Sequence, residues 1–578
     1  MDVDSRPVSR PVVAALALLL DVLGAATALI VLVTIVAGPW AVTIGGHFVR
    51  VRSTGNLLVG LLLLAVLRAL TPQFPILAVR SWTLPALRRT ASAWLAALSR
   101  RLDTVEARTA LRVVGILIVA ASAIRVGNVF AHYGFLTGDD VEIHEMTLGV
   151  ALGKPWQAWD IRNAFYPMTF VFPVQRGLVA LGVTDVFQLV AAGRLAVTAI
   201  AAVNVWILYR VALSLYGDRG TALIAAALLA VSHLHIASGS TELPRTVATA
   251  FLVPALWVLR TPTLATCGLA GLLLGVGASL RFGEVVFAVP AVLSVLDAGG
   301  HDAARAPFRA RVTGAATMLA VMTATILAAI GLSDALYWGR PFHSLLSIVD
   351  YTLVKRLSSG GFQPPWYYVT HITDWSNVLL VVLACLAWGP VGRRALLWAA
   401  LPLIVLSVLP HKEARYAIAT IPFWALAAAS TLRAWIADGE VRAPQPMRFR
   451  VGALGVAIVV AAAVAFDAGK WRFVRSEAAV RLGWAMRDSG TAGIAAEQLW
   501  RFGGRLYLDT AAPLIDLDPQ ESDPDRLRQA LSRPDVHWAA LRLRPFPADL
   551  TAVLHDCGFV PDVTARDAGY QLFRKRSD

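Results

Sequence analysis

Residues 189–213, LVAAGRLAVTAIAAVNVWILYRVAL, form an apolar run long enough to cross a lipid bilayer as a helix. A hydrocarbon core about 30 Å thick needs roughly 20 apolar helical residues. Several other runs are short, and 263–298 can form either a tight hairpin or a broken helix, so we expect eleven to thirteen spans. The candidates are 11–37, 54–71, 111–131, 189–213, 220–238, 246–260, 263–280, 284–298, 312–333, 377–392, 395–410, 414–435 and 452–469.

The composition of the chain is that of a membrane protein. Its 578 residues are 57% hydrophobic and 16% charged, whereas a soluble domain carries about 25% charge. These values exclude a soluble enzyme. The net charge of +14 comes mainly from arginines in loops beside apolar segments, which is typical of cytoplasmic anchoring and not of a nucleic-acid-binding stripe. We therefore expect membrane lipids as surroundings and no nucleic acid as a partner.

Arginine placement predicts the orientation of the chain. With the N-terminus in the cytoplasm, most arginine-rich loops fall inside, and residues 132–188, 334–376 and 470–578 fall outside. Residues 74–100 alternate apolar and basic side chains, which favours a helix lying on the inner leaflet. We predict an N-terminal extension over 1–105 with two spans and this interfacial segment, then a transmembrane domain over 106–469.

The segment 470–578 changes composition toward charged residues and proline, and predicts a small soluble extracytoplasmic domain. SEAAVRLGWAMRDSG (476–490) and DPDRLRQALSR (523–533) have helical spacing, while RLYLD (505–509), HWAALRLR (537–544) and YQLFRK (570–575) have strand character. The predicted fold class is therefore an all-α polytopic membrane protein with a C-terminal α/β domain.

Ionisable residues at the outer boundary are the candidates for chemistry, because such groups are kept near a bilayer mainly where they meet water, substrate or each other. The adjacent Asp139 and Asp140 can act as a general base or can simply cap a helix. The cations of the outer segments can clamp a phosphate or anchor lipid headgroups; they are Arg162, Arg245, Arg281, Lys412 and Arg415.

The turn HKEAR (411–415) packs four charged or titratable side chains between two apolar runs, which favours a wet or functional turn over a polar hairpin cap. Trp366 can stack on a sugar or a lipid tail, or can belong to an interfacial tryptophan belt. The histidines show no metal-ligand spacing, so we expect no metal site, although the carboxylates could hold a hard cation through oxygen. No glycine-rich nucleotide loop is present in the sequence.

At HKEARYAIATIPFWAL (411–426) the sequence resembles the GT-C glycosyltransferases, and within them glycosyltransferase family 22, the α-mannosyltransferases of GPI-anchor and dolichol-linked oligosaccharide assembly. Its His-Lys-Glu-x-Arg-aromatic motif is matched by His411, Lys412, Glu413, Arg415 and Tyr416, and its early acidic motif resembles Asp139, Asp140 and Glu145. Further similar segments contain Trp159, Asp160, Arg162 and Pro167, then Asp334, Tyr337 and Gly339, then Pro365, Trp366 and Tyr368. The resemblance covers about 110–435.

The resemblance implies a multi-pass enzyme of the bacterial cytoplasmic (plasma) membrane that works on its extracytoplasmic side. It implies transfer of mannose or another hexose from a polyprenyl-phosphate donor to a glycan or glycolipid acceptor, with no cofactor. Asp139 is the first choice as base and Asp140 the second. Donor phosphate and substrate contacts are expected from Glu145, Arg162, Arg245, Arg281, Trp366, His411, Lys412, Glu413 and Arg415.

The residues themselves agree with this chemistry. A lipid-linked sugar phosphate needs apolar surface for its tail, cations for the leaving phosphate and a carboxylate near the acceptor hydroxyl, and it needs no nucleotide loop. One carboxylate base suffices for an inverting transfer. Two alternatives stay open: a transporter or flippase of a lipid-linked anion, which should carry midplane charges and a repeat between its halves, and a GT-C enzyme for another sugar.

Overall fold

The computed structural model describes residues 97–156, 158–297, 307–355, 362–387, 389–437, 464–471, 477–488, 493–508, 513–517, 524–542, 548–567 and 569–576. It also describes parts of 19–51, which include the paired strands β1 (Trp40–Ile44) and β2 (His47–Val51). The predicted span 54–71 lies outside the described residues, as do most of the spans 11–37 and 452–469 and of the interfacial segment 74–100.

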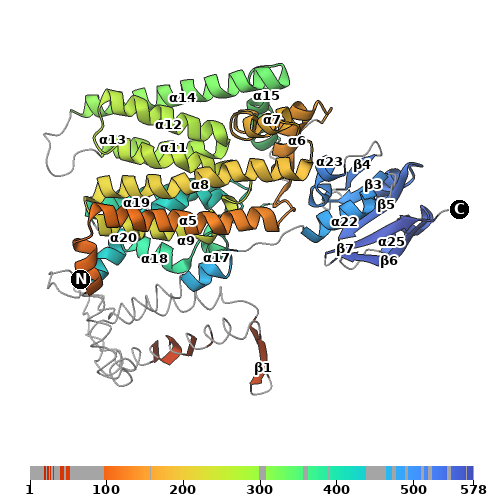
Figure 1. Ribbon diagram of the computed structural model, residues 1–578, viewed down its shortest axis with the longest axis horizontal. Helices are drawn as coiled ribbons and strands as arrows, with labels where there is room; N and C mark the ends of the chain where they lie inside the picture. Colours follow the sequence, from red (N-terminus) through yellow and green to blue (C-terminus); the bar gives the residue numbers. More distant parts are fainter. Residues whose placement is uncertain are drawn as a thin grey trace, which may run out of the picture.

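Helices with roughly parallel axes make up most of the protein (Figure 1). Among the described residues, five are long and apolar enough to cross a membrane: α5 (Ala107–Ala131), α8 (Val186–Tyr216), α14 (Phe308–Trp338), α19 (Gly389–Val408) and Ala414–Ala437. The last begins as the 3₁₀ turn η4 (Ala414–Thr420) and continues as α20 (Ile421–Ala437). The fold is thus the predicted polytopic helical one.

Shorter apolar helices complete the bundle. They are α9 (Arg219–Val231), α11 (Pro244–Val258), α12 (Leu264–Leu280) and the pair η2 (Phe282–Phe287) and α13 (Ala288–Leu296). The chain breaks between α12 and η2 at Arg281, whose backbone is extended (φ −151°, ψ 122°). The expected spans 263–280 and 284–298 form a hairpin, because a Cβ at Gly314 of α14 would lie 3.1 Å from Sγ of Cys267, near the start of α12, and 3.5 Å from Cγ1 of Val295, near the end of α13. The expected span 220–238 is split at Ser232 into α9 and the short α10 (His233–Ser238).

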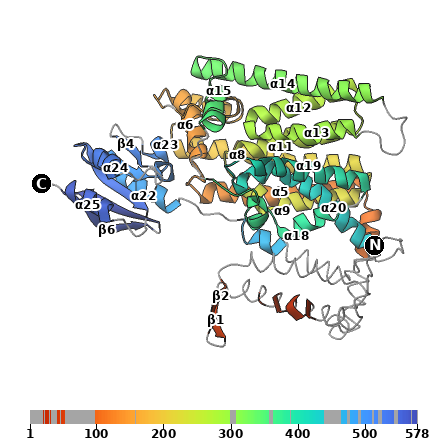
Figure 2. The same ribbon diagram turned by 180° about the vertical axis from the view of Figure 1, so that it is seen from behind.

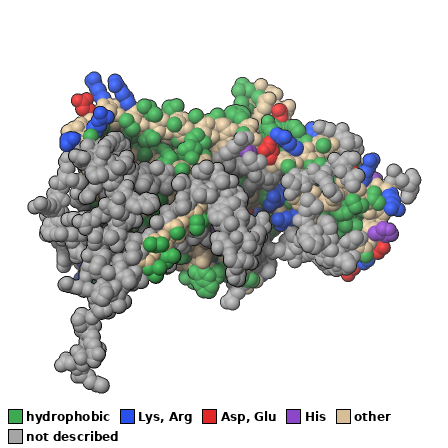
Figure 3. All heavy atoms as spheres, turned by 90° about the horizontal axis from the view of Figure 1, so that it is seen from below, with side chains coloured by type: hydrophobic (Ala, Val, Ile, Leu, Met, Phe, Trp, Pro, Cys, Tyr) green, Lys and Arg blue, Asp and Glu red, His purple; other side chains and the backbone are tan. Residues whose placement is uncertain are grey.

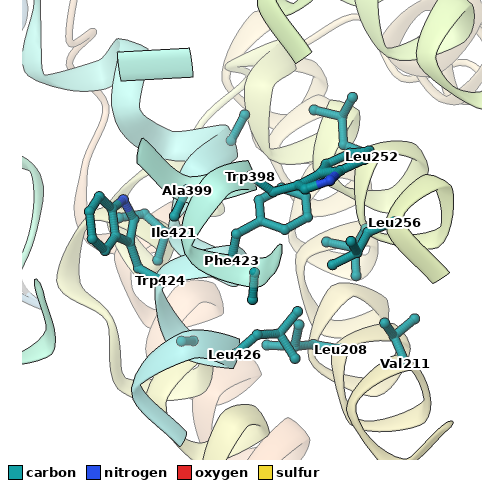
Figure 4. Packing of buried hydrophobic residues seen from close by; sticks show 14 of the residues in the cluster. Leu208, Val211, Leu252, Leu256, Trp398, Ala399, Ile421, Phe423, Trp424 and Leu426 are labelled. Carbon is teal, nitrogen blue, oxygen red and sulfur yellow. The ribbon is translucent and has the colours of Figure 1, made fainter. Parts of the chain in front are cut away.

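The bundle is packed by large side chains at its centre and by glycines between α12 and α14. Trp398 and Phe423 lie 5.4 Å apart between ring centroids and face leucines of α8 and α11 (Figure 4). On α12, a Cβ at Gly275 would lie 2.6 Å from Cβ of Thr325, and one at Gly271 would overlap the carbonyl oxygen of Met318. Small residues four apart allow the close backbone approach by which membrane helices associate.

The surface agrees with a membrane setting. Apolar side chains such as Ile116 (67% exposed) and Val119 (69% exposed) point outward from α5. In Figure 3 charged side chains gather at the two ends of the molecule, with apolar surface between them. Lipid replaces water against such a band, and the helices satisfy their own backbone polar groups there.

Short elements gather at the end of the bundle next to the C-terminal domain. They include α6 (Gly138–Leu152), the π-helical turn η1 (Pro167–Val171), α7 (Phe172–Ala180) and α15 (His343–Val349), and Figures 1 and 2 show α6, α7 and α15 together from both sides. The remaining short elements are η3 (Asp350–Val354), α16 (Tyr367–Thr370), α17 (Ile372–Trp375) and α18 (Val378–Cys385).

The C-terminal segment folds as an α/β domain around a five-stranded sheet in the order β4-β3-β5-β7-β6. β3 is parallel to β4 and β5, and β7 is antiparallel to β5 and β6. Along the chain the elements are α22 (Glu477–Asp488), β3 (Gly493–Glu497), η5 (Leu499–Phe502), α23 (Gly504–Tyr507), β4 (Leu514–Leu517), α24 (Pro524–Leu531), β5 (Val536–Arg542), α25 (Ala548–Asp556), β6 (Phe559–Asp567) and β7 (Tyr570–Lys575).

Two of the three predicted strands are correct, namely HWAALRLR as β5 and YQLFRK as β7. The predicted strand RLYLD is wrong, because its first three residues lie in the helix α23. Leu506 and Tyr507 are both buried in one apolar cluster against the helical bundle. In a strand, these two neighbouring side chains would point to opposite faces and could not both join that cluster.

Gly271→Ile should destabilise the bundle, because a branched side chain cannot fit against the backbone of α14. Overpacking of this kind costs about 1–3 kcal/mol. We expect a lower thermal unfolding midpoint in detergent. Gly268→Ile is the matched control. Gly268 lies on the same helix, and a Cβ there meets nothing within 4 Å. Equal midpoints for the two variants would contradict this packing.

Candidate active site

Three arginines converge on the carboxylate of Asp139, in the first turn of α6. Arg162 Nη2 lies 2.7 Å from Oδ1, while Arg281 Nη2 and Arg415 Nη1 each lie 3.0 Å from Oδ2. Burial raises the pKa of Asp139, but the three guanidiniums, with Arg415 foremost, outweigh it and hold the pKa far below its usual range. The carboxylate is therefore ionised and tightly paired.

The three arginines come from segments that are distant in sequence. Arg162 lies in the loop after α6, Arg281 at the break between α12 and η2, and Arg415 in the turn η4. Irregular backbone at each place lets a long side chain leave its helix axis and reach the end of the bundle next to the C-terminal domain. The structure thus brings together Asp139, Arg162, Arg281 and Arg415 from the predicted set.

Further carboxylates surround the same cations. Glu142, one turn beyond Asp139, accepts a hydrogen bond from Arg162 Nε. Glu413 accepts from Arg415 Nη2 at 2.9 Å and lies 2.9 Å from His411 Nε2. Burial raises the pKa of Glu413, but Arg415 and His411 lower it to about 2. His411 and Glu413 therefore also belong to this group, which we call the arginine cluster: Asp139, Glu142, Arg162, Arg281, His411, Glu413 and Arg415.

Asp140 has a different environment from its neighbour. It is fully buried, its Oδ2 accepts a hydrogen bond from the backbone N–H of Leu136 at 3.0 Å, and its Oδ1 accepts from the hydroxyl of Thr137 at 3.1 Å. The same Thr137 hydroxyl accepts from Arg415 Nη1 at 2.9 Å. Asp140 thus holds the turn that leads into α6 and is connected by hydrogen bonds to the arginine cluster through Thr137.

A second ionic group lies behind Asp140, and sequence reasoning did not assign it. Arg194 Nε lies 2.7 Å from Glu242 Oε2, and the other two guanidinium nitrogens donate to the carbonyls of His132 and Gly134 at 2.9 Å each. His144 Nε2 lies 3.5 Å from the same Glu242 oxygen. An arginine near the start of the apolar run 189–213 was the available signal, because a charge inside a membrane helix is costly without a partner.

Arg245, predicted to contact phosphate, forms an ion pair inside the protein. Its Nη1 contacts Glu284 Oε1, and its guanidinium lies 4.4 Å from the ring centroid of Tyr416. Both members of the ion pair are almost completely buried, at 4% and 1% exposure. The structure therefore places Arg245 behind the HKEAR turn and gives it no contact with Asp139.

Three other predicted residues lie apart from the arginine cluster. Lys412 Nζ donates to the carbonyls of Gln363 (2.9 Å) and Leu409, so it fastens the turn to a neighbouring segment. Trp366, 62% exposed, precedes α16 on that same segment. Glu145 points to the C-terminal domain, where its Oε1 accepts a hydrogen bond from the backbone N–H of Arg505 at 3.3 Å.

Among the residues that the structure describes, no group of three or more His, Cys, Asp or Glu side chains could hold a metal ion.

The arginine cluster contains three guanidiniums against three carboxylates, so its acids are already matched by cations. Such a group is suited to exchange one anion for another, because a phosphate can take over guanidinium contacts that a carboxylate now makes.

Residues 141–470 match the model of the Alg9-like mannosyltransferase family, which is more than half of the chain. The chain belongs to this family. It is therefore a membrane glycosyltransferase, as the HKEAR motif and the early acidic motif indicated. No curated protein matches the sequence.

Solved structures show the same fold. The crystal structure of ArnT from Cupriavidus metallidurans in the apo state aligns with a TM-score of 0.53 at 13% identity, over 80% of this chain and 97% of that one. The crystal structure of ArnT from the same organism bound to undecaprenyl phosphate aligns with a TM-score of 0.51 at 13% identity over the same shares. The membrane domain thus has the predicted GT-C fold.

Asp140→Asn should flatten the dependence of stability on pH. Burial and the negative charge of Glu242 raise the pKa of Asp140 from 3.8 to about 7. Between these values the folded protein holds a proton that the unfolded chain has lost, so this group's contribution is fully present below about pH 4 and disappears as the pH rises through 7. We expect the wild type to lose more stability than the variant over this window.

Thermal unfolding midpoints in detergent at a series of pH values measure the difference. Asp160→Asn is the control, because that carboxyl is 68% exposed and lies outside the buried network. Parallel pH profiles for the wild type and Asp140→Asn would show that Asp140 does not carry this proton.

Proposed function

We propose that this enzyme transfers mannose, or another hexose, from a polyprenyl-phosphate donor to an extracytoplasmic glycan or glycolipid acceptor. The transfer inverts the anomeric centre and uses Asp139 as the base. The enzyme acts at the outer face of the cytoplasmic membrane, and the positive-inside distribution of arginines supports this location for the arginine cluster. The convergence of three arginines on Asp139 carries the proposal.

The arginine cluster suits a lipid-linked sugar phosphate better than a neutral substrate. Arginine presents its donors in a planar fork that matches phosphate oxygens in pairs, and here such forks are held within reach of one another. The ArnT structure bound to undecaprenyl phosphate shows that a protein of this fold accepts such a lipid, which supports the proposed class of donor.

Apolar surface for the lipid tail lies beside the HKEAR turn. Trp366 (62% exposed), Val369 (73%) and Val408 (82%) flank it, and the backbone N–H of Gln363 donates to the carbonyl of Pro410 at 2.9 Å, which joins the two segments. A polyprenyl chain can cover these side chains while its phosphate meets Arg415 and His411. Trp366 is therefore proposed as a contact of the lipid.

Donor binding also activates the base in this mechanism. Without donor, Asp139 is a weak base, because three guanidiniums stabilise its ionised form. When the donor phosphate recruits part of their hydrogen bonding, the pKa of Asp139 rises toward a useful range. Asp139 then removes the acceptor proton, the acceptor oxygen bonds to the anomeric carbon, and the electron pair of the breaking C–O bond passes to the phosphate, whose growing charge the arginines stabilise.

Asp139 is preferred over Asp140 because of what each carboxylate already does. Asp140 is fully buried, and both of its oxygens are engaged by the turn before α6. An acceptor hydroxyl cannot approach it without unfolding that turn. Asp140 is therefore proposed to position Asp139 and Arg415, through Thr137, and not to exchange a proton with the acceptor.

Asp139→Asn should abolish transfer while the protein remains folded and inserted. General-base catalysis contributes about 10²–10⁴-fold, so we expect kcat to fall by that factor with the donor still bound. The assay incubates purified protein with radiolabelled polyprenyl-phosphate-mannose and a membrane lipid extract and follows label in the acceptor. Full activity of Asp139→Asn would show that Asp139 is not the base. The proposed donor would be refuted if the wild type gave no labelled product with any polyprenyl-phosphate hexose.

Arg415→Gln should raise the donor KM and lower kcat, because this arginine is proposed to hold the leaving phosphate. Losing one charge-assisted contact to phosphate costs about 1.5–3 kcal/mol, or roughly 10–100-fold in kcat/KM. Arg433→Gln is the matched control, since it breaks ion pairs with Asp103 and Asp218 in other parts of the bundle. Unchanged donor kinetics in Arg415→Gln would exclude it from the phosphate site.

A further inference from the structure

The helix that carries Asp139 is held from its other side by the C-terminal domain. Val141 and Leu148 of α6 share one apolar cluster with Val480, Leu506 and Tyr507 of that domain. Figure 1 shows α23 directly beside the end of the bundle that contains α6. One face of the helix therefore meets the arginine cluster, and the other is covered by a domain that lies largely beyond the matched family region.

The contact depends on two consecutive glycines. Gly503 and Gly504 both have left-handed backbone angles, with φ of 83° and 54°. A Cβ at Gly504 would lie 2.9 Å from Cγ1 of Val141 and 3.1 Å from Oε1 of Glu145. Only glycine allows this backbone to approach α6 so closely in this conformation.

Polar and aromatic contacts fix the position of the glycine turn on the helix. Glu145, only 9% exposed, accepts a hydrogen bond from the backbone N–H of Arg505. The Tyr507 hydroxyl donates to the carbonyl of Tyr133 at 3.1 Å, in the segment just before α6. The Tyr507 ring also stacks on Phe187 of α8, with centroids 4.2 Å apart.

The contact reaches the first turn of α6, next to the proposed base. A Cβ at Gly138 would lie 3.7 Å from the Trp500 ring, and Gly138 directly precedes Asp139. Trp500 thus covers the start of the helix at Gly138, while Glu145 is held seven residues or about 10 Å further along it, at 1.5 Å per residue. Two points of attachment fix both the position and the direction of the helix axis.

We propose that the C-terminal domain is a positioning element of the active site: it holds α6 so that Asp139 meets the arginine cluster and the acceptor in register. This inference rests on the proposed function of Asp139. Glu145 is accordingly a positioning residue, fastened to Arg505, and not a substrate contact. Small displacements of a reacting group, about 1 Å, can cost on the order of 10²-fold in rate, so a loosened α6 should lower kcat and leave donor affinity unchanged.

The first test uses Gly504→Ala, which pushes the turn away from α6, in the full-length protein. We expect kcat to fall by about tenfold or more with the donor KM unchanged, and hydrogen exchange in residues 138–152 to accelerate. The double variant Gly504→Ala/Val141→Ala removes the methyl that the new Cβ meets first, and should recover part of both losses.

Gly558→Ala is the matched control. This glycine lies in the same domain at φ 77°, and a Cβ there meets nothing within 4 Å. It therefore imposes the same kind of backbone strain on the domain without touching α6. It should leave kcat and the hydrogen exchange of 138–152 as in the wild type.

A second test separates the hydrogen bond from the packing. Glu145→Gln keeps an oxygen that can accept from Arg505 N–H and should retain activity, whereas Glu145→Ala should lower kcat and speed exchange in 138–152. A raised donor KM with unchanged exchange in Glu145→Ala would overturn the inference and return Glu145 to the substrate site.

The two readouts distinguish failure of this inference from failure of the proposed function. If the wild type shows no transfer, the exchange measurements still decide whether the domain holds α6. If transfer is found and Gly504→Ala changes neither kcat nor exchange, the positioning role is refuted while the proposed transferase stands.

Discussion

Compensation of charge around Asp139 is the constraint on which the end of the bundle next to the C-terminal domain depends. Three guanidiniums packed within one group repel each other, and each would be costly to hold partly buried without a counter-charge. Three carboxylates neutralise these positive charges, those of Asp139, Glu142 and Glu413. Because the cations come from the loop after α6, the break after α12 and the turn before α20, these ion pairs tie the three segments to one another.

The pair Asp139 and Asp140 shows how neighbouring residues acquire opposite electrostatic character. The arginines hold the pKa of Asp139 far below its usual range, while burial and the charge of Glu242 raise that of Asp140 to about 7. The helix makes this possible, because consecutive residues point about 100° apart around its axis. Environments that separate the pKa values of two acids in this way are typical of sites that divide chemical and structural tasks.

The sequence was sufficient for the helical bundle, for the gathering of arginines at one end of it and for much of the tail, because apolar run length, arginine placement and a contiguous motif are local properties. It could not show in which direction a side chain points around its helix. Glu145 lies on the same helix as Asp139 but faces the C-terminal domain, and Arg245 turns inward to Glu284. The helix α23 was predicted as a strand because the local pattern does not show that Leu506 and Tyr507 both pack against the helical bundle.

On the proposed mechanism, the same ionic contacts can also govern release of the product. After transfer, Asp139 carries the proton of the acceptor and no longer competes for Arg162, Arg281 and Arg415, while the phosphate has gained negative charge and binds them more strongly. The product complex is therefore held most tightly while that proton stays on Asp139. Once the proton leaves, the carboxylate regains the three contacts seen here, and the arginines are drawn back from the phosphate. The ion pairs that lower the basicity of Asp139 before the donor binds thus also help to displace the polyprenyl phosphate after transfer. One set of contacts therefore keeps the base weak when no donor is bound and promotes release of the product.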